Sequence, residues 1–329
     1  MDRILDIKNM TISFKTDNGD VKVVRNVDLE VNDGEVLAIV GESGSGKSVT
    51  MKSIMDILPS YSLVNADTMI LNGKNLQELT VKEKSKMLGN EVSMIFQDPM
   101  TALNPLKKIG SHLVEIIRRH QKISKKEAKV LAIEMLGKVG IPSPEKRMEQ
   151  YPHEFSGGMR QRVLIAMALC SHPKLLIADE PTTALDVTIQ AQILRLLKQL
   201  HEKEKMNIIL ITHDLGVVAS IADRIAVMYG GRIMEVGTKD EILYNPQNPY
   251  TKALLKAMPK SELKNGEKLM SIPGNVPSLS EIGEGCPFAG RCEYTEESCY
   301  TERGGKSRFS DSHISYCLTR ESEGITKGA

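Results

Sequence analysis

The feature that most constrains the fold is a loop at residues 41–48, which reads Gly-Glu-Ser-Gly-Ser-Gly-Lys-Ser. It fits the pattern G-x-x-x-x-G-K-[ST]. The loop lies between an apolar run at residues 36–40 and an amphipathic stretch at residues 47–58, which Pro59 closes. A strand that feeds a helix through such a loop turns backbone amides toward phosphate oxygens, and the helix N-terminus adds positive potential. The sequence therefore predicts a phosphate-binding α/β domain.

Two side chains of this loop have distinct expected roles. Lys47 would place its ammonium on the β and γ phosphates of a nucleotide, and the Ser48 hydroxyl would ligate Mg²⁺. Every residue of the loop is expected to contact ATP: Gly41, Glu42, Ser43, Gly44, Ser45, Gly46, Lys47 and Ser48.

A second element follows at residues 175–178, a short apolar run that ends in Asp179 and Glu180. Two adjacent acidic residues at the end of a buried strand rarely serve packing. We expect Asp179 to bind Mg²⁺ through water, and Glu180 to face the γ-phosphate and orient or deprotonate the attacking water. Together with the loop, this strand end predicts nucleotide hydrolysis.

The periodicity elsewhere indicates an α/β core. Apolar runs at 174–178 and 207–212 flank a helical stretch at 188–203, the alternation expected of a parallel sheet with crossover helices. Near the N-terminus, short alternating runs on both sides of a turn signal at residues 17–20 predict an antiparallel hairpin.

Two further regions are added to this core. Between residues 97 and 156 the hydrophobic period is helical, so we expect an inserted helical subdomain at about 98–160. Beyond residue 245, clustered prolines and short polar stretches mark a loop-rich extension. The expected division is a nucleotide-binding domain at 1–245 and a C-terminal extension at 246–329.

A third motif separates this chain from other phosphate-loop proteins. Residues 155–162 read Phe-Ser-Gly-Gly-Met-Arg-Gln-Arg, and the Ser-Gly-Gly-x-x-Gln core resembles the signature of the ABC ATPase family. A serine hydroxyl, glycine amides and a helix N-terminus together present a nest for an oxyanion. In that family the nest completes the site of a partner subunit, so that two ATP molecules lie head to tail. The resemblance assigns this role to Ser156, Gly157, Gly158 and Gln161.

The other elements of the family follow in chain order, and the resemblance covers roughly residues 4–245. By resemblance, Gln97 reaches Mg²⁺ and the attacking water and senses the transmembrane partner. Asp186 would couple the two ATP sites, and His213 would contact the γ-phosphate. Phe14 matches the position where the family stacks an aromatic ring on adenine, although the hairpin after it is longer than usual. The implied fold is an ABC-type P-loop ATPase with an antiparallel β subdomain.

Composition excludes several other classes of protein. Lysine and arginine number 43 against 42 acidic residues, so no general positive field collects nucleic acid or anionic lipid. No apolar run approaches the roughly 18 residues of a membrane-spanning helix. The N-terminus has an acid where a secretory signal has basic residues, so we expect a chain that stays in the reducing cytoplasm.

The extension narrows the expected function. It contains Asn-Pro-Tyr-Thr-Lys-Ala-Leu-Leu at 248–255, Pro-Gly-Asn-Val-Pro at 273–277 and Gly-Cys-Pro-Phe-Ala-Gly-Arg-Cys at 285–292. This string resembles the C-terminal region of the ATPases of oligopeptide and dipeptide importers. The related nickel importers share much of it, so uptake of Ni²⁺ or another small solute is the alternative. A soluble ABC protein that acts on ribosomes or DNA is a third reading, disfavoured because the chain has neither long coiled coils nor a duplicated cassette.

The extension also contains a cysteine cluster with the spacing C-x5-C-x6-C-x17-C. Four thiolates suit a [4Fe-4S] cluster or Zn²⁺, or they stay free, and resemblance to importer members with such a cluster favours iron–sulfur. The bound metal cluster would stabilise the extension structurally or, alternatively, act as a redox or metal sensor that regulates the ATPase. His313 would be an outer neighbour of the metal or a surface residue, and Cys170 a buried small hydrophobe. The expected ligands are Cys286, Cys292, Cys299 and Cys317.

The resemblance also implies the partners. Transport requires two separate transmembrane permease subunits, docked on the helical insertion near Gln97. A second, homologous ATPase subunit would complete the dimer, and an extracytoplasmic solute-binding protein would act indirectly. The expected location is the cytoplasmic face of the cell membrane, as a peripheral subunit that binds no nucleic acid.

Overall fold

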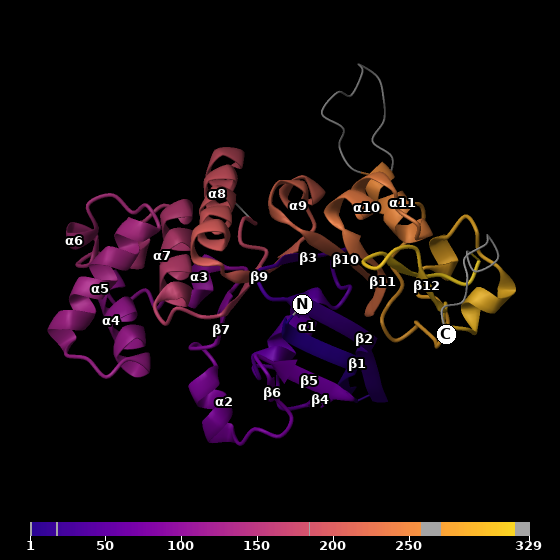
Figure 1. Cartoon of the computed structure of the whole chain (residues 1–329), viewed down its shortest axis with the longest axis horizontal. Coiled ribbons are helices and arrows are strands. Elements are labelled where there is room, and N and C mark those ends of the chain that lie inside the picture. Colours follow the sequence, from indigo (N-terminus) through magenta and orange to yellow (C-terminus); the bar gives the residue numbers. More distant parts are fainter. Residues whose placement is uncertain (1, 18, 184, 258–270, 320–329) are drawn as a thin grey trace, which may run out of the picture. The chain divides into compact units, whose positions relative to one another are not determined.

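The computed structural model describes most of the chain (Figure 1), in the ranges 2–17, 19–183, 185–257 and 271–319. Some positions used in the sequence predictions lie outside these ranges. They are Met1, Asn18 of the predicted turn, Ala184 beside Asp186, and the parts of the predicted extension at 258–270 and 320–329.

The chain forms two compact units, each assembled from segments that are separated in sequence. The first unit comprises residues 1–4, 32–36 and 70–211. The second unit comprises residues 5–31, 37–69 and 212–329.

The first unit is built on three strands in the order β9–β8–β7. They run parallel, with Val92 of β7 opposite Leu175 of β8, and Leu175 opposite Asn207 of β9. Every residue of the three strands is buried, as expected for parallel strands. Their bounds are β7 Val92–Ile95, β8 Leu175–Asp179 and β9 Asn207–Thr212.

Helices make up most of the remainder of this unit. The described residues between 98 and 156 contain helices and no strand, as the hydrophobic period predicts. Helices α4, α5 and α7 pack against one another (Figure 1). A capping box in which Ser124 and Glu127 satisfy each other's backbone amides begins α5. The bounds are α3 Pro99–Ala102, α4 Ile109–His120, α5 Lys125–Lys138, α6 Pro144–Arg147, η1 Pro152–Glu154, α7 Gly157–Leu169 and α8 Val187–Glu204.

A smaller segment at residues 68–87 contains two short strands and a helix. The short strands β5 (Thr68–Leu71) and β6 (Lys74–Asn75) pair antiparallel, with Ile70 opposite Asn75. Helix α2 (Val81–Met87) follows and begins with a capping box formed by Thr80 and Glu83.

The second unit contains the predicted N-terminal hairpin. Strands β1 (Arg3–Thr16) and β2 (Gly19–Asn32) are hydrogen-bonded neighbours, and β4 (Ser62–Asn65) pairs antiparallel with β1. Strand β3 (Val36–Val40) leads through the phosphate loop into helix α1 (Lys47–Ile54). This helix ends before the predicted residue 58, and Asp56 beyond it has a left-handed φ of 53° that a helix cannot accommodate.

The second unit also contains a sheet to which the C-terminal extension contributes two strands. The order is β12–β13–β11–β10–β3, in which β3 and β10 are parallel and the other pairs are antiparallel. The sequence predicts a loop-rich appendage, whereas the structure places β12 and β13 at the edge of this sheet. The bounds are α9 Leu215–Ile221, β10 Arg224–Tyr229, β11 Arg232–Thr238, α10 Lys239–Tyr244, α11 Pro249–Lys256, η2 Ala289–Arg291, η3 Glu297–Tyr300, β12 Lys306–Arg308 and β13 Ile314–Tyr316.

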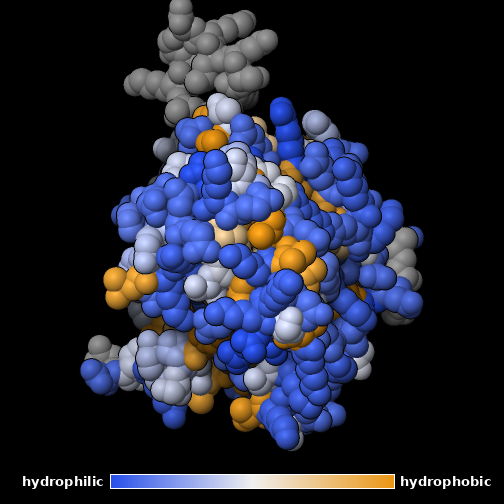
Figure 2. Space-filling view, turned by 90° about the vertical axis from the view of Figure 1, so that its left-hand side faces the viewer, coloured by the Kyte–Doolittle hydropathy of each residue, from blue (hydrophilic) through white to orange (hydrophobic). Residues whose placement is uncertain are grey.

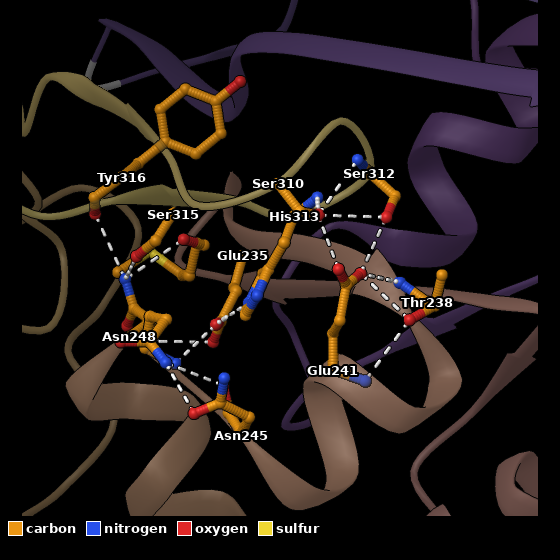
Figure 3. Close-up of polar contacts among 12 residues, drawn as sticks. Glu235, Thr238, Glu241, Asn245, Asn248, Ser310, Ser312, His313, Ser315 and Tyr316 are labelled. Atoms are coloured by element: carbon orange, nitrogen blue, oxygen red, sulfur yellow. Dashed lines mark hydrogen bonds and ion pairs between the residues drawn. The ribbon is translucent and has the colours of Figure 1, made fainter. Parts of the chain in front are cut away.

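A buried polar junction joins the last strand to β11 (Figure 3). His313 Nε2 lies 2.7 Å from Glu235 Oε1, and both side chains are almost completely buried. The Glu235 carboxylate also accepts the backbone N–H groups of Gln247 (2.6 Å) and Asn248 (3.1 Å). Of the two alternatives predicted for His313, the surface position is therefore wrong, because this carboxylate gives its imidazole a partner inside the fold.

Candidate active site

The phosphate loop lies in the second unit, between β3 and α1. Gly41 has a φ of 151°, and a Cβ at this position would stand 1.9 Å from the Met228 carbonyl oxygen. Only glycine permits this close approach of β10 to the loop. Lys47 is buried, and its Nζ donates to the carbonyl oxygens of Gly41 (2.8 Å) and Glu42 (2.9 Å). The loop therefore holds its lysine beside the helix N-terminus, where an anion is favoured.

The carboxylate strand end lies in the first unit. Asp179 is buried as the last residue of β8, and Glu180 follows with a left-handed φ of 46°. The Glu180 carboxylate accepts hydrogen bonds from Gln97 Nε2 (2.7 Å) and from Thr183 Oγ1 (2.8 Å). A non-glycine residue in this region costs about 1–3 kcal/mol and is typical of active sites. The structure thus brings Gln97 and Glu180 together.

Thr183 was missed by the sequence predictions. It lies three residues after Glu180 within the same turn, and its backbone N–H donates to the Glu180 carbonyl (3.2 Å). The turn therefore presents the Thr183 hydroxyl to the Glu180 carboxylate. A hydroxyl residue three positions beyond a strand-end acid is the only sequence signal for this contact, and it is a weak one.

The Ser-Gly-Gly turn begins helix α7, also in the first unit. The Ser156 hydroxyl accepts the Met159 N–H at 3.4 Å as the N-cap, and Ser156 and Gly157 are exposed. A Cβ on Gly158 would stand 2.5 Å from Ile189 Cγ2 of helix α8. Gln161 is buried, and its Nε2 has no hydrogen-bond partner among the described residues. The turn therefore exposes its hydroxyl and first glycine while its second glycine packs against α8.

Asp186 acts as the N-cap of that same helix. Its Oδ1 accepts the Ile189 N–H at 2.9 Å. A Cβ on Gly157 would lie in ordinary contact, 3.5 Å from the Leu185 side chain. The start of α8, with Asp186, therefore adjoins the Ser-Gly-Gly turn, which the family resemblance did not imply.

The remaining predicted residues lie in the second unit. His213 is exposed between β9 and α9, and the Asp214 side chain caps α9 by accepting the N–H groups of Gly216 (2.8 Å) and Val217 (3.2 Å). Phe14 is half-buried on β1, and its ring meets the edge of the Tyr61 ring at 5.8 Å between centroids.

The four cysteines of the extension line one small cavity of about 20 Å³, and none forms a disulfide. Burial, and to a smaller extent the neighbouring thiols, raise the pKa of Cys286 to about 11. Within the described ranges, however, no three His, Cys, Asp or Glu side chains are arranged to hold a metal ion. The predicted ligands thus converge on one pocket without the geometry of a closed metal site.

Cys170, the fifth cysteine, is separate from this pocket on the chain. Its side chain is buried at the end of α7, and burial raises the pKa of its thiol to about 12. The prediction of a buried small hydrophobe is confirmed.

Comparison with known proteins identifies the family. A model described as "ABC transporter" matches residues 24–183, and one described as "Oligopeptide/dipeptide transporter, C-terminal region" matches residues 234–299. The oligopeptide transport ATP-binding protein OppD of Bacillus subtilis (strain 168) is 53% identical over 312 residues, 94% of this chain and 87% of that protein. The chain belongs to the ABC transporter ATP-binding proteins.

A second relative and a solved structure support the assignment of this ABC protein to the family. The dipeptide transport ATP-binding protein DppD of the same organism is 52% identical over 98% of this chain and 96% of that protein. Among solved structures, the dimeric post-hydrolysis state of the ATP-binding cassette MJ0796 bound to ADP and Pi has a TM-score of 0.64 at 26% identity. The match covers 71% of this chain and 98% of that cassette. The predicted ABC-type α/β fold and the ATPase class are therefore confirmed.

None of the helices in the described ranges combines the length and hydrophobicity that a membrane crossing requires.

Proposed function

We propose that this chain is the ATP-hydrolysing subunit of an importer that takes up oligopeptides or dipeptides through separate membrane subunits. The match of residues 234–299 to the oligopeptide/dipeptide transporter C-terminal region carries this proposal. The likeness to OppD and DppD along more than nine-tenths of the chain supports it. We assign residues 1–245 to nucleotide hydrolysis and residues 246–329 to the transporter-specific extension.

The proposed chemistry follows from the residues of the phosphate loop and of the acidic end of β8. Lys47 and the loop amides would bind the phosphates, and Ser48 and Asp179 would hold Mg²⁺. Glu180 orients or deprotonates the attacking water, and the short hydrogen bond from Gln97 supports its position. His213 contacts the γ-phosphate and Phe14 the adenine.

The Ser-Gly-Gly turn serves the ATP of the opposite subunit. Its exposed hydroxyl and the α7 N-terminus supply donors to the partner's γ-phosphate, as expected of an anion nest. The assigned residues are Ser156, Gly157, Gly158, Gln161 and, for coupling between the two sites, Asp186.

The assembly comprises two permease subunits and a homologous second ATPase, with an extracytoplasmic solute-binding protein that delivers the peptide. We place the chain at the cytoplasmic face of the membrane. Figure 2 shows a face of the helical insertion, on which separate hydrophobic residues lie on a mainly hydrophilic surface. Leu106 (86% exposed) and Val130 (52% exposed) of the helical insertion are apolar side chains available to a permease.

Uptake measurements on cells lacking this chain test the solute. Complementation with the wild-type chain should restore uptake of labelled di- and oligopeptides, and Glu180→Gln should not, because hydrolysis drives transport. Restoration of ⁶³Ni²⁺ uptake without peptide uptake would replace the peptide proposal with the nickel alternative. Purification of the complex through a tag on this chain should recover two permeases and a second ATPase, and recovery of ribosomes or DNA instead would refute the importer assignment.

We further propose that Cys286, Cys292, Cys299 and Cys317 hold a [4Fe-4S] cluster, with Zn²⁺ as the alternative. The support is their convergence on one pocket and the burial of Cys299, with the other three cysteines half-buried. Binding would displace the thiol protons, which the raised pKa of Cys286 opposes in the metal-free chain. When bound, the group would cross-link the loops of the extension.

Metal and sulfide content of anaerobically purified protein tests this assignment. We expect about four iron and four sulfide per chain, lost in Cys292→Ser and retained in Cys170→Ser, which removes a thiol outside the pocket. About one zinc per chain without sulfide would support the alternative. Retention of metal in Cys292→Ser would contradict both.

A further inference from the structure

The second residue of the phosphate loop is tied to the C-terminal extension. Arg291, at the end of η2, forms two parallel hydrogen bonds with the Glu42 carboxylate: Nη1 to Oε2 at 2.6 Å and Nη2 to Oε1 at 3.2 Å. The two residues are separated by 249 positions, and the side chains are only 7% and 22% exposed. This bidentate geometry is the strongest that an arginine makes with a carboxylate.

Arg291 is itself held in place by its surroundings. Its Nη1 also donates to the Tyr229 hydroxyl at 3.1 Å, and its guanidinium lies 5.8 Å from the centroid of the Tyr229 ring. Its Nε donates to the Pro273 carbonyl (3.0 Å) and its Nη2 to the Ile272 carbonyl (3.2 Å). A guanidinium with this many partners has a fixed position. Arg291 therefore acts as a clamp that holds the Glu42 carboxylate in place.

The backbone of Glu42 is also held by a residue of the C-terminal extension. Its N–H donates to the hydroxyl of the buried Tyr250 at 3.1 Å. In addition, residues Val276, Pro277 and Leu279 of the extension share a cavity of about 110 Å³ with loop residues 42–45. The extension therefore contacts the loop through a charged pair, a backbone hydrogen bond and a common cavity wall.

The clamp affects nucleotide binding through the charges of Glu42 and Arg291. A carboxylate in a phosphate-binding loop repels a triphosphate, and the effect is stronger near a protein surface than in water. Arg291 carries a permanent positive charge that offsets the charge of Glu42. Without Arg291 the loop would keep its shape-determining glycines but would present an uncompensated negative charge to ATP.

We propose that Arg291 is a positioning residue for nucleotide binding: it neutralises Glu42 and holds the phosphate loop, so the C-terminal extension sets the affinity of this chain for ATP. The proposal rests on ATP binding by the loop and is independent of the transported solute. It also gives the extension a role in the ATPase cycle that family membership alone does not assign.

Equilibrium titration of the full chain with MgATP tests the proposal. Arg291→Ala should weaken binding about tenfold at low salt, the effect expected of one uncompensated charge several ångströms from the ligand. The loss should shrink as salt rises, because screening weakens the repulsion. Glu42→Gln alone should bind MgATP more tightly than wild type, because it removes the negative charge and leaves the positive charge of Arg291 uncompensated. The double variant R291A/E42Q should recover most of the lost affinity.

Matched controls separate this role from a purely structural one. Arg303→Ala removes another arginine of the extension, one that donates to the Asn26 carbonyl and stacks on Tyr316, and it should leave ATP affinity unchanged. If R291A does not fold, R291Q replaces it, because glutamine keeps polar contacts and removes the charge. Affinity of the single variant within twofold of wild type, or no recovery in the double variant, would overturn the proposal. Failure of peptide uptake would not affect this binding assay, so the two proposals fail independently.

Discussion

Glu180 occupies an energetically costly backbone conformation at the end of β8. Its left-handed φ of 46° aims the carboxylate at Gln97 and Thr183, which both donate to the same oxygen, Oε2. Two donors on one oxygen hold the carboxylate in a fixed orientation. The position, the strain and the hydrogen bonds all agree with a general base.

The first prediction concerns this carboxylate. Glu180→Gln should lower the ATP turnover number by about 10²–10⁴-fold, because an amide cannot accept the proton of the attacking water. ATP affinity should stay close to wild type, since the phosphate loop is untouched. Steady-state hydrolysis and MgATP titration measure the two quantities. Turnover within a few-fold of wild type would remove Glu180 from its assigned role.

At the scale of elements, helix α7 and helix α8 meet through a glycine. Gly158 allows Ile189 to approach the turn that begins α7, and Asp186 caps α8 one turn before that contact. A movement of the Ser-Gly-Gly turn would therefore displace the start of α8. This packing supplies a physical link between residues that sequence resemblance names separately.

The second prediction tests this packing. Gly158→Ala would bring a methyl group to 2.5 Å from Ile189 Cγ2, so we expect a loss of about 1–3 kcal/mol in the free energy of unfolding. Gly157→Ala is the matched control, because its methyl would meet Leu185 at an ordinary 3.5 Å. Denaturant unfolding measures both. Ile189→Ala in the G158A background should recover part of the loss, and a G158A chain as stable as wild type would show that the helices yield to the added methyl.

A second contact between elements joins helix α10 to the segment before β13 (Figure 3). Glu241 accepts hydrogen bonds from the hydroxyls of Ser310 (2.5 Å) and Ser312 (2.9 Å) and from the Thr238 N–H (2.8 Å). Burial opposes ionisation, but these hydrogen bonds prevail and lower the pKa of Glu241 to about 2 from the usual 4.5. The ionised carboxylate therefore stabilises the fold.

The third prediction follows from the sign of this shift. A carboxyl whose pKa is lowered by folding contributes stability above its unfolded pKa, and this contribution disappears as pH falls toward about 2. Glu241→Gln should cost on the order of 1 kcal/mol near pH 7, since the group is partly solvated. The difference between variant and wild type should narrow below about pH 4.5. Thermal unfolding between pH 7 and pH 3.5 measures it, and a pH-independent difference would contradict the account.

For the molecule as a whole, the extension is an integral part of the second unit. Phe288 packs its ring against Tyr229 (5.4 Å between centroids) and Tyr250 (5.1 Å), and all three side chains are buried in the core of that unit. The same region supplies two edge strands and the clamp on Glu42. Stability of the nucleotide-binding unit and integrity of the extension are therefore coupled.

The fourth prediction measures this coupling. Phe288→Ala should lower the free energy of unfolding by about 3–5 kcal/mol, because it removes a buried ring and leaves a cavity. Tyr300→Ala, a substitution of an aromatic residue of the extension that is 58% exposed, should have little effect. If both variants unfold at the wild-type denaturant concentration, the extension is an independent appendage and the coupling is absent.

Sequence by itself determined the local elements and most of the site. The phosphate loop, the acidic strand end, the Ser-Gly-Gly turn and helices such as α4 and α5 are encoded within a few consecutive residues, so spacing and periodicity predict them. Helix α1 and the edge strands β12 and β13 were less predictable, because weak patterns are decided by what packs against them.

Tertiary structure alone decided which distant side chains meet. The pairing of Arg291 with Glu42, the burial of His313 against Glu235 and the convergence of four thiols on one pocket all join segments far apart in the chain. Such contacts depend on how buried surfaces fit together, and a single sequence gives no periodic signal for them. The polar partners follow from that packing, because a group taken out of water must find a hydrogen bond wherever the fold places it.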